Sequence, residues 1–221
     1  ARILWKKAKK YTKKAFYLPN GVELAKIKRF LPSKTLKERK KFKVGYVGSL
    51  NDWVRVRDFV VLAKALPEVE VWVVGTGTQL SWLRERRQKE ELKNLKLFGA
   101  KPHREVFRYI ARFDLALYPF KINKLTHSVS PIKLFEYWAC KKCVLAVPTY
   151  ELKQYPKELV FYHTPKELVK KVKWLMKHPD IRKRKGEAGY RTMLRRHNWS
   201  GSLGEQLRRI ISDLITNKKS K

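Results

Sequence analysis

The sequence predicts an α/β fold, in which an open parallel sheet carries helices on both faces and further helices follow. Two observations predict it. Short apolar runs of strand character alternate along the chain with segments whose apolar residues recur every three or four positions. Gly48, Gly75, Gly99 and the loop 119–130 each follow one of the strands. Ligands bind at the carboxyl ends of parallel strands, so we expect these segments to converge on one site.

The strands and helices are expected to alternate as far as the strand before Pro148, with a last strand and three helices after it. Strands are expected at residues 42–47, 69–74, 95–98 and 115–118, shortly before Pro148, and at 159–162. Helices are expected at residues 54–66, 80–92, 103–112, after Ser130-Pro131, and at 166–177, 181–196 and 199–215. The pattern divides the chain into a basic N-terminal segment with a linker (1–41), the sheet domain (42–198) and a C-terminal helix with a basic tail (199–221).

The N-terminal segment combines charge with aromatic residues. Residues 1–17 are basic and helix-compatible, with four interleaved aromatic residues, Trp5, Tyr11, Phe16 and Tyr17. Asn20-Gly21 predicts a turn, because both residues tolerate positive φ. Residues 31–41 are polar and charged, which is typical of a linker. The segment 1–17 suits an anionic surface, or its rings pack on a neighbouring domain; both interpretations stay open.

The stretch 115–148 carries the chemistry. It reads as a buried strand, a loop, a helix and a second buried strand. Proline needs no donor at the first helical position, so Pro131 predicts a helix start with Ser130 as its cap. A helix N-terminus attracts anions, and Lys133 adds a full charge to the first turn. Glu136 lies on a similar face and would accept hydrogen bonds from a pair of sugar hydroxyls. The alternative is that Lys133 and Glu136 form a solvated pair on an amphipathic helix.

The motif SPIKLFEYWA, with the apolar strand after it, resembles the donor-nucleotide signature in the C-terminal domain of GT-B glycosyltransferases of the group-1 type. The loop PFKINKLTHS, the turn LPNGV, and the segments VGYVGSL, VEVWVVGTG and LKLFGAKPHREVFRYIARFDLALYPF match this family in order and approximate spacing. HNWS resembles the start of its C-terminal helix. The resemblance covers roughly residues 18–216 and implies a Rossmann-like nucleotide-sugar-binding domain.

The resemblance also implies roles for individual residues. It places Gly48 and Ser49 near the donor diphosphate with Ser130, Pro131 and Lys133, and it places Glu136 on the ribose. Further residues follow from it: Gly99, Ala100 and Lys101 near the base, and Asn123 and Thr126 near the sugar. Lys133 would stabilise the leaving diphosphate, with Arg55 as a helper. The turn Gly75-Thr76-Gly77 is interpreted as structural only.

Three departures from the family pattern leave room for a degenerate site. Ser128 stands where many group-1 enzymes carry a Glu, so recognition of the donor sugar must differ. Ser49 occupies a position where an Arg or Lys is usual, with Arg55 and Arg57 nearby. Lys141 replaces the usual Gly of a tight turn, where left-handed backbone would cost about 1 kcal/mol.

The function implied is transfer of a sugar from a UDP- or GDP-linked donor to an acceptor, with retention at the anomeric carbon. The acceptor would be lipid-linked or a polysaccharide, and no metal or other cofactor is expected. The chain alone would bind donor but transfer little, because an N-terminal domain would be missing. Two alternatives stay open: a non-catalytic basic module that binds nucleic acid or anionic membrane, and a GT-B-fold nucleotide-sugar epimerase. The sequence has no G-x-S-x-G, H-E-x-x-H or Walker motif.

The charge is strongly positive and concentrated at both ends of the chain. The formal net charge is +34; residues 1–43 hold 16 Lys/Arg against 2 acidic residues, and residues 166–221 hold 17 against 5. This field would attract phosphorylated substrates, an anionic membrane surface or, less in favour, nucleic acid. The expected location is cytoplasmic, with peripheral contact to the inner face of the membrane as an extension of that expectation. Cys140 and Cys143 lie at a helix end without further metal ligands, which predicts reduced structural thiols.

Overall fold

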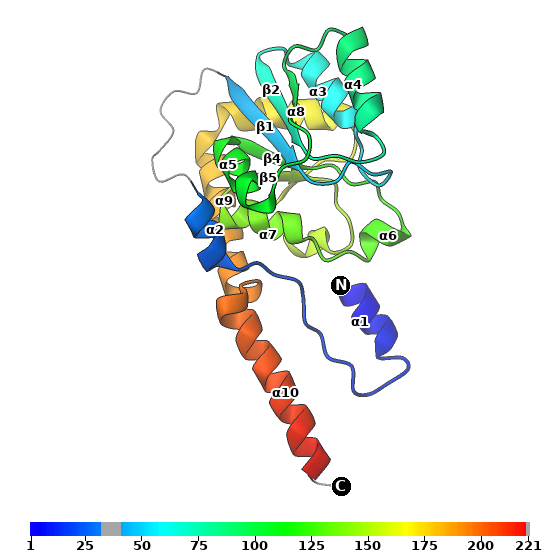
Figure 1. Ribbon diagram of the computed structural model, residues 1–221, viewed down its shortest axis with the longest axis vertical. Coiled ribbons are helices and arrows are strands. Elements are labelled where there is room, and N and C mark those ends of the chain that lie inside the picture. Colours follow the sequence, from blue (N-terminus) through cyan, green and yellow to red (C-terminus); the bar gives the residue numbers. More distant parts are fainter. Residues whose placement is uncertain (32–40, 220–221) are drawn as a thin grey trace.

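The computed structural model describes residues 1–31 and 41–219 of the chain, so the predicted linker lies almost entirely outside the described residues. Its centre is a six-stranded sheet in the order β3-β2-β1-β4-β5-β6, with every pair parallel (Figure 1). The strands are β1 Phe42–Val47, β2 Val69–Val74, β3 Leu95–Leu97, β4 Leu115–Tyr118, β5 Val144–Ala146 and β6 Val160–Phe161. The strand order reverses direction between β1 and β4. Ligands of open parallel sheets bind at this topological switch point.

Helices cover both faces of the sheet, as the sequence predicted. One face carries α3 (Arg57–Ala65) and α4 (Leu80–Lys89), with α8 (Pro165–Lys177) against α3. The other face carries α5 (His103–Arg112) and α7 (Ile132–Ala139), backed by α2 (Leu24–Phe30) and α9 (Pro179–Arg196). The remaining elements are α1 Arg2–Ala8, α6 Lys124–His127, a 3-10 turn at Leu152–Gln154, a π-type turn at Trp199–Leu203 and α10 Gly204–Lys219. The Rossmann-like fold class is confirmed.

Local structure departs from what the sequence indicated in three places. The helix expected from residue 54 begins at Arg57, because Val54 instead forms an antiparallel bridge with Phe120. Only Arg2–Ala8 of the basic segment 1–17 is helical. The helices α2 and α6 were not expected; both are short, and the buried side of α2 consists of Leu24 and Ile27 alone.

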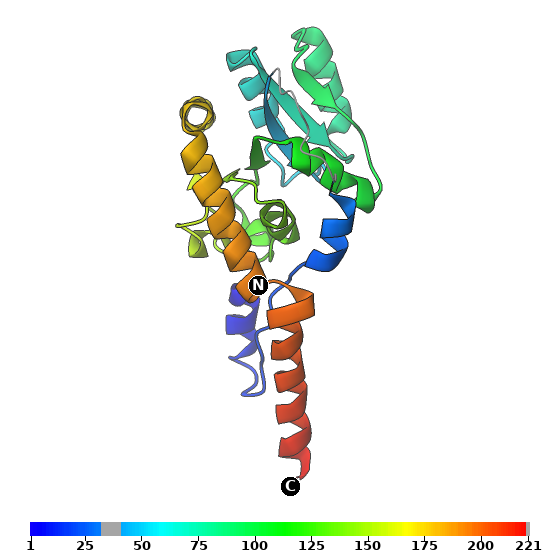
Figure 2. The same cartoon turned by 90° about the vertical axis from the view of Figure 1, so that its left-hand side faces the viewer.

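The two ends of the chain are tied together beside the sheet domain. The Val22 N–H donates to the His197 carbonyl at 2.8 Å, and the Trp199 N–H donates to the Val22 carbonyl at 3.0 Å. The His197 ring is buried and stacks on Phe135 with ring centroids 3.8 Å apart. As a result, α10 and the N-terminal segment leave the domain on the same side (Figure 2).

Among the helices of residues 1–31 and 41–219, none is both long enough and apolar enough to cross a membrane.

Candidate functional site

The carboxyl ends of β1, β2 and β3 meet in three adjacent glycine turns. The Gly48 N–H donates to the Val74 carbonyl at 2.9 Å, and the Gly75 N–H donates to the Gly99 carbonyl at 2.7 Å. A Cβ on Gly75 would lie 1.9 Å from the Gly48 carbonyl oxygen, so only glycine allows this approach. Gly75 therefore holds the turns together, in agreement with its structural interpretation.

Lys133 lies directly over Gly48. A Cβ on Gly48 would lie 1.8 Å from Lys133 Cε and 2.7 Å from Lys133 Nζ, and the φ of Gly48 is +139°. The ammonium group is 5.9 Å from the centre of the Phe120 ring. Burial lowers the pKa of Lys133, and the neighbouring Glu136 carboxylate opposes that shift. A half-buried cation thus faces the end of β1 from the first turn of α7, beside N–H groups that have no acceptor within the helix.

The start of α7 differs from the predicted cap. Pro131 is the N-cap rather than the first helical residue, and no side chain caps the helix. The Ser130 hydroxyl instead accepts the Asn20 N–H at 3.3 Å, while Asn20 Nδ2 donates to the Ser130 carbonyl at 3.2 Å. The capping prediction was wrong: the helix begins after Pro131, and Ser130, one residue before the cap, bonds the turn at Asn20-Gly21 instead.

Glu136 is paired with a residue that the sequence analysis did not select. His103 Nε2 lies 2.7 Å from Glu136 Oε1; the carboxylate side chain is 10% exposed and the imidazole 71%. His103 opens α5 immediately after Gly99, Ala100, Lys101 and Pro102, so it comes from the same edge of the sheet. The sequence signal that could have identified His103 as a site residue was its position directly after a strand-end loop. The pair joins elements 33 residues apart, which no local sequence pattern reveals.

The residues predicted near the base form an open turn. Gly99 has φ +68°, and a Cβ there would meet nothing within 4 Å. Ala100 and Lys101 are exposed. Ser49, predicted near the diphosphate, is also exposed, and its carbonyl accepts the Tyr46 hydroxyl at 2.8 Å. The backbone of this turn is therefore open on the side where a Gly99 side chain would lie.

The side chains of Asn123 and Thr126, expected near the sugar, are occupied by each other. Asn123 Oδ1 accepts the Thr126 N–H at 2.9 Å, and Thr126 Oγ1 accepts the Asn123 N–H at 3.1 Å. This reciprocal capping box starts α6, and Thr126 is buried. These two residues therefore shape the loop after β4, and their side chains do not converge with Lys133.

Arg55, expected to assist Lys133, points elsewhere. Its Nε lies 3.0 Å from Asp58 Oδ2, and its Nη1 donates to the His163 carbonyl at 2.9 Å. Asp58 is buried and also accepts the Tyr162 hydroxyl at 2.7 Å. A buried carboxylate thus holds the guanidinium between α3 and the end of β6. We therefore do not assign Arg55 to the donor site.

The end of α7 agrees with two further expectations. Lys141 is left-handed, with φ +54°. Cys140 and Cys143 are free thiols, and burial raises the pKa of each to about 12. Within the described part of the chain, no group of three or more His, Cys, Asp or Glu side chains is placed to hold a metal ion.

The family model described as Glycosyl transferase-like matches residues 36–207 of the chain, and the chain belongs to this family. Its fold is that of the C-terminal domain of GT-B glycosyltransferases, as the motifs implied. No curated protein matches the chain in sequence.

Solved structures with this fold are related only distantly in sequence. HepE from Anabaena in complex with UDP-glucose is 16% identical with a TM-score of 0.70, over 89% of this chain and 57% of HepE. Sucrose-phosphate synthase from Thermosynechococcus elongatus is 18% identical with a TM-score of 0.66, over 97% of this chain and 57% of the synthase. WaaG, a glycosyltransferase involved in lipopolysaccharide biosynthesis, is 15% identical with a TM-score of 0.59, over 80% of this chain and 51% of WaaG. The chain spans little more than half the length of these proteins.

Proposed function

We propose that this chain binds the nucleotide-sugar donor of a glycosyltransferase. One observation carries the proposal: Lys133 lies over Gly48 at the end of β1, beside the switch point between β1 and β4, and the Glu136 carboxylate is near enough to raise the pKa of Lys133. An ammonium group beside a helix N-terminus binds a diphosphate, and a carboxylate one turn further along binds the two ribose hydroxyls. The known UDP and UDP-glucose complexes of HepE support a uridine donor.

Each group of residues contacts a different part of the donor. Lys133, the Ser130-Pro131 loop and the backbone of Gly48 and Ser49 lie at the diphosphate. Glu136 binds the ribose, while Gly99, Ala100 and Lys101 form the turn beside the base. The loop of Asn123 and Thr126 borders the sugar through its backbone.

Negative charge develops on the leaving diphosphate during the reaction, at the part of the site that is positive. The bond from the anomeric carbon to the diphosphate oxygen breaks, and its electron pair stays on the diphosphate. The acceptor hydroxyl oxygen bonds to that carbon and releases its proton to solvent, with retention of configuration. Lys133 stabilises the negative charge on the leaving diphosphate, which lowers the barrier. Glu136 anchors the nucleoside and takes no proton.

Calorimetric titration with UDP, GDP and ADP tests the donor site. We expect one nucleotide to bind, and we expect Lys133→Gln and Glu136→Gln each to weaken it at least tenfold, because each loses a charged hydrogen bond. Lys89→Gln and Glu85→Gln make the same charge changes on the exposed face of α4 and serve as controls. Equal losses in the controls, or binding unaffected by either site variant, would contradict the proposal.

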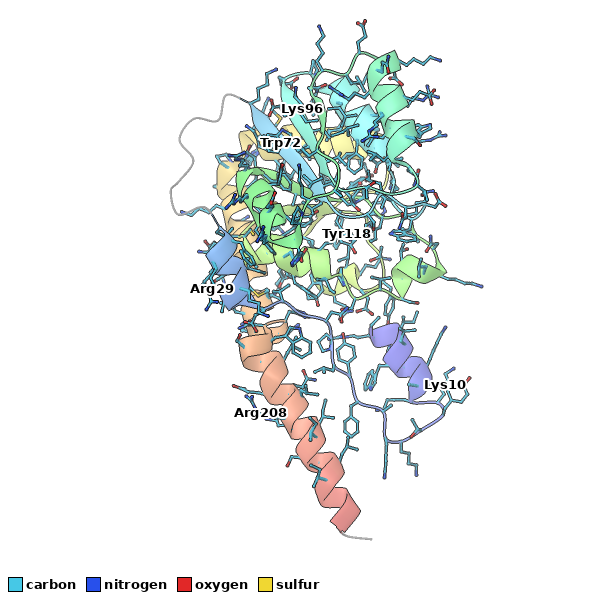
Figure 3. All side chains as sticks on the ribbon, in the orientation of Figure 1. Lys10, Arg29, Trp72, Lys96, Tyr118 and Arg208 are labelled. Carbon is cyan, nitrogen blue, oxygen red and sulfur yellow. The ribbon has the colours of Figure 1, made fainter. Side chains whose placement is uncertain are left out.

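A second candidate function is attachment to an anionic membrane surface. The supporting observation is an exposed apolar stripe on α10, formed by Leu207, Ile211, Leu214 and Ile215 beside Arg208 and Arg209. Figure 3 shows Arg208 on α10 and Lys10 on the N-terminal segment, both outside the sheet domain. Such a face inserts at a lipid interface while its cations meet the headgroups.

Vesicle flotation distinguishes the partners of the basic surface. Binding to vesicles with anionic lipid that is reduced by Ile211→Glu supports the membrane. DNA binding that is lost as the salt concentration rises, and that Ile211→Glu does not change, supports nucleic acid as the partner. A nucleotide-sugar epimerase would instead release a free epimerised donor without any acceptor, which product analysis detects.

A further inference from the structure

A hollow of ≈ 550 Å³ separates the N-terminal segment from the loop after β5. Arg2, Trp5, Lys6 and Tyr17 line it from the N-terminal side, and Tyr150 and Lys153 line it from the loop. We call it the arm pocket. Figure 1 shows α1 beside the edge of the domain that carries α6.

Aromatic rings and cations alternate around the arm pocket. The Arg2 guanidinium lies 5.7 Å from the centre of the Tyr17 ring, which is itself 5.8 Å from the Trp5 ring. Lys6 Nζ donates to the Tyr150 hydroxyl at 3.2 Å. Each of the three rings thus has a cation beside it: Arg2 at Tyr17, Lys6 at Tyr150 and Lys9 over Trp5.

Among the residues that the structure describes, no acidic side chain lines the arm pocket. Glu151, adjacent in sequence, is buried, and its carboxylate accepts the Arg2 backbone N–H at 2.7 Å and Gln154 Nε2 at 3.0 Å. Two other hollows of the domain differ in both respects. The one between Pro67 and Asn94 and the one along α4 each contain glutamates and no aromatic ring. Rings and cations thus distinguish the arm pocket from these two hollows. A neighbouring hollow, lined by Tyr17, Tyr155, Arg195, Arg196 and His197, also combines them.

The arm pocket is held in place from both sides. Trp5 Nε1 donates to the Ala15 carbonyl at 3.0 Å, which fixes α1 on the segment that follows it. The Arg2 N–H bond to buried Glu151 fixes α1 on the domain. These contacts leave the Arg2 guanidinium and the Lys6 and Lys153 ammonium groups at the pocket wall.

The arm pocket lies on the same edge of the sheet as the proposed donor site. The Tyr150 N–H donates to His127 Nδ1 at 2.9 Å, and His127 is the last residue of α6. The loop of α6 follows β4 and leads to Lys133, while Tyr150 follows β5. A molecule in the arm pocket would thus approach the loop that borders the donor sugar.

We propose that the arm pocket binds the acceptor, as a saccharide that carries a phosphate or carboxylate group. The rings cover the apolar C–H face of a sugar, and Arg2, Lys6 and Lys153 pair with the anion. The assignment of this saccharide as the acceptor rests on the proposed function. The binding site itself does not.

Titrations at 150 mM salt with four probes test the arm pocket: glucose 6-phosphate, glucuronate, glucose and inorganic phosphate. We expect the two anionic sugars to bind at least tenfold more tightly than glucose or phosphate. The double variant Arg2→Gln/Lys153→Gln removes two pocket charges, and Tyr150→Ala removes a ring; each should cost at least tenfold in affinity. Lys10→Gln/Lys13→Gln removes two exposed charges of the same segment outside the pocket and should change affinity less than twofold.

The outcomes separate this proposal from the donor site. UDP binding should survive Arg2→Gln/Lys153→Gln, and glucose 6-phosphate binding should survive Glu136→Gln. Glucose 6-phosphate binding without any nucleotide binding would keep the arm pocket and remove the proposed function. The arm pocket is overturned if the anionic sugars do not bind, if phosphate binds as tightly as they do, or if the Lys10/Lys13 control loses as much affinity as the pocket variant.

Discussion

At the residue scale, the site depends on one close contact between a glycine and a lysine. Gly48 gives Lys133 its place at the end of β1, because any side chain there would occupy the position of Lys133 Cε. The sequence predicted both residues from their motifs. It did not predict that Glu136 would meet His103, because that contact is made only when α5 and α7 pack on the same face of the sheet.

A pair of glycine substitutions tests this contact. Gly48→Ala should reduce nucleotide affinity at least tenfold by displacing Lys133, and should lower the unfolding free energy by about 1–3 kcal/mol through its positive φ. Gly201→Ala is the control, since Gly201 lies outside the donor site and the nearest atom to its added Cβ would be Asn198 Nδ2 at 3.3 Å. Calorimetry and denaturant unfolding measure both. Equal nucleotide affinity in the two variants would contradict the role of Gly48.

His197 makes stability depend on pH. The Asn20 carbonyl can only accept, so His197 Nδ1 carries the proton and Nε2 accepts the Tyr155 hydroxyl, each at 2.9 Å. Burial lowers the pKa of this imidazole from 6.5 to about 4. The unfolded chain therefore binds a proton between these values that the folded chain excludes. The unfolding free energy should fall as the pH drops from 6.5 to 4, by about 3 kcal/mol in total.

Urea unfolding between pH 4 and pH 7 measures the His197 effect. His197→Gln removes the titrating group and should flatten the curve in that window, although it is less stable at pH 7. An unchanged slope in His197→Gln would show that other groups cause the pH dependence.

At the element scale, apolar periodicity predicted the helices and strands, and side-chain caps fix the starts of α6 and α8. The helix expected at residue 166 starts at Pro165, because the Thr164 hydroxyl accepts the Glu167 N–H at 3.2 Å. The short helices α2 and α6 escaped prediction, because neither carries a periodic apolar stripe long enough to recognise. The side-chain roles of Asn123 and Thr126 also escaped, because a capping box and a sugar-binding loop use the same residue types.

The packing of α7 against α9 gives a test at this scale. A Cβ on Gly189 of α9 would lie 2.2 Å from Trp138 Cδ1 in α7. Gly→Ala stabilises an exposed helix by up to about 1 kcal/mol, yet Gly189→Ala should destabilise by about 1–3 kcal/mol through overpacking. The double variant with Trp138→Leu should recover part of that loss in a double-mutant cycle. A stabilising Gly189→Ala would mean that the helices do not approach this closely.

At the scale of the whole molecule, the fold and the charge have separate consequences. The strand order places the loops after β1 and β4 side by side, which determines where a donor would bind. The alternation along the sequence predicted a parallel sheet but not this order, which depends on contacts between distant strands. The excess of positive charge at both ends favours anionic partners in general, and the proposed arm pocket would give part of it a defined geometry.

A crystal structure of the chain with UDP tests the central claim most directly. We expect the diphosphate beside Lys133 and the first turn of α7, with both ribose hydroxyls within hydrogen-bond distance of the Glu136 carboxylate. UDP bound away from Gly48, or bound there with its ribose out of reach of Glu136, would contradict this account of the donor site.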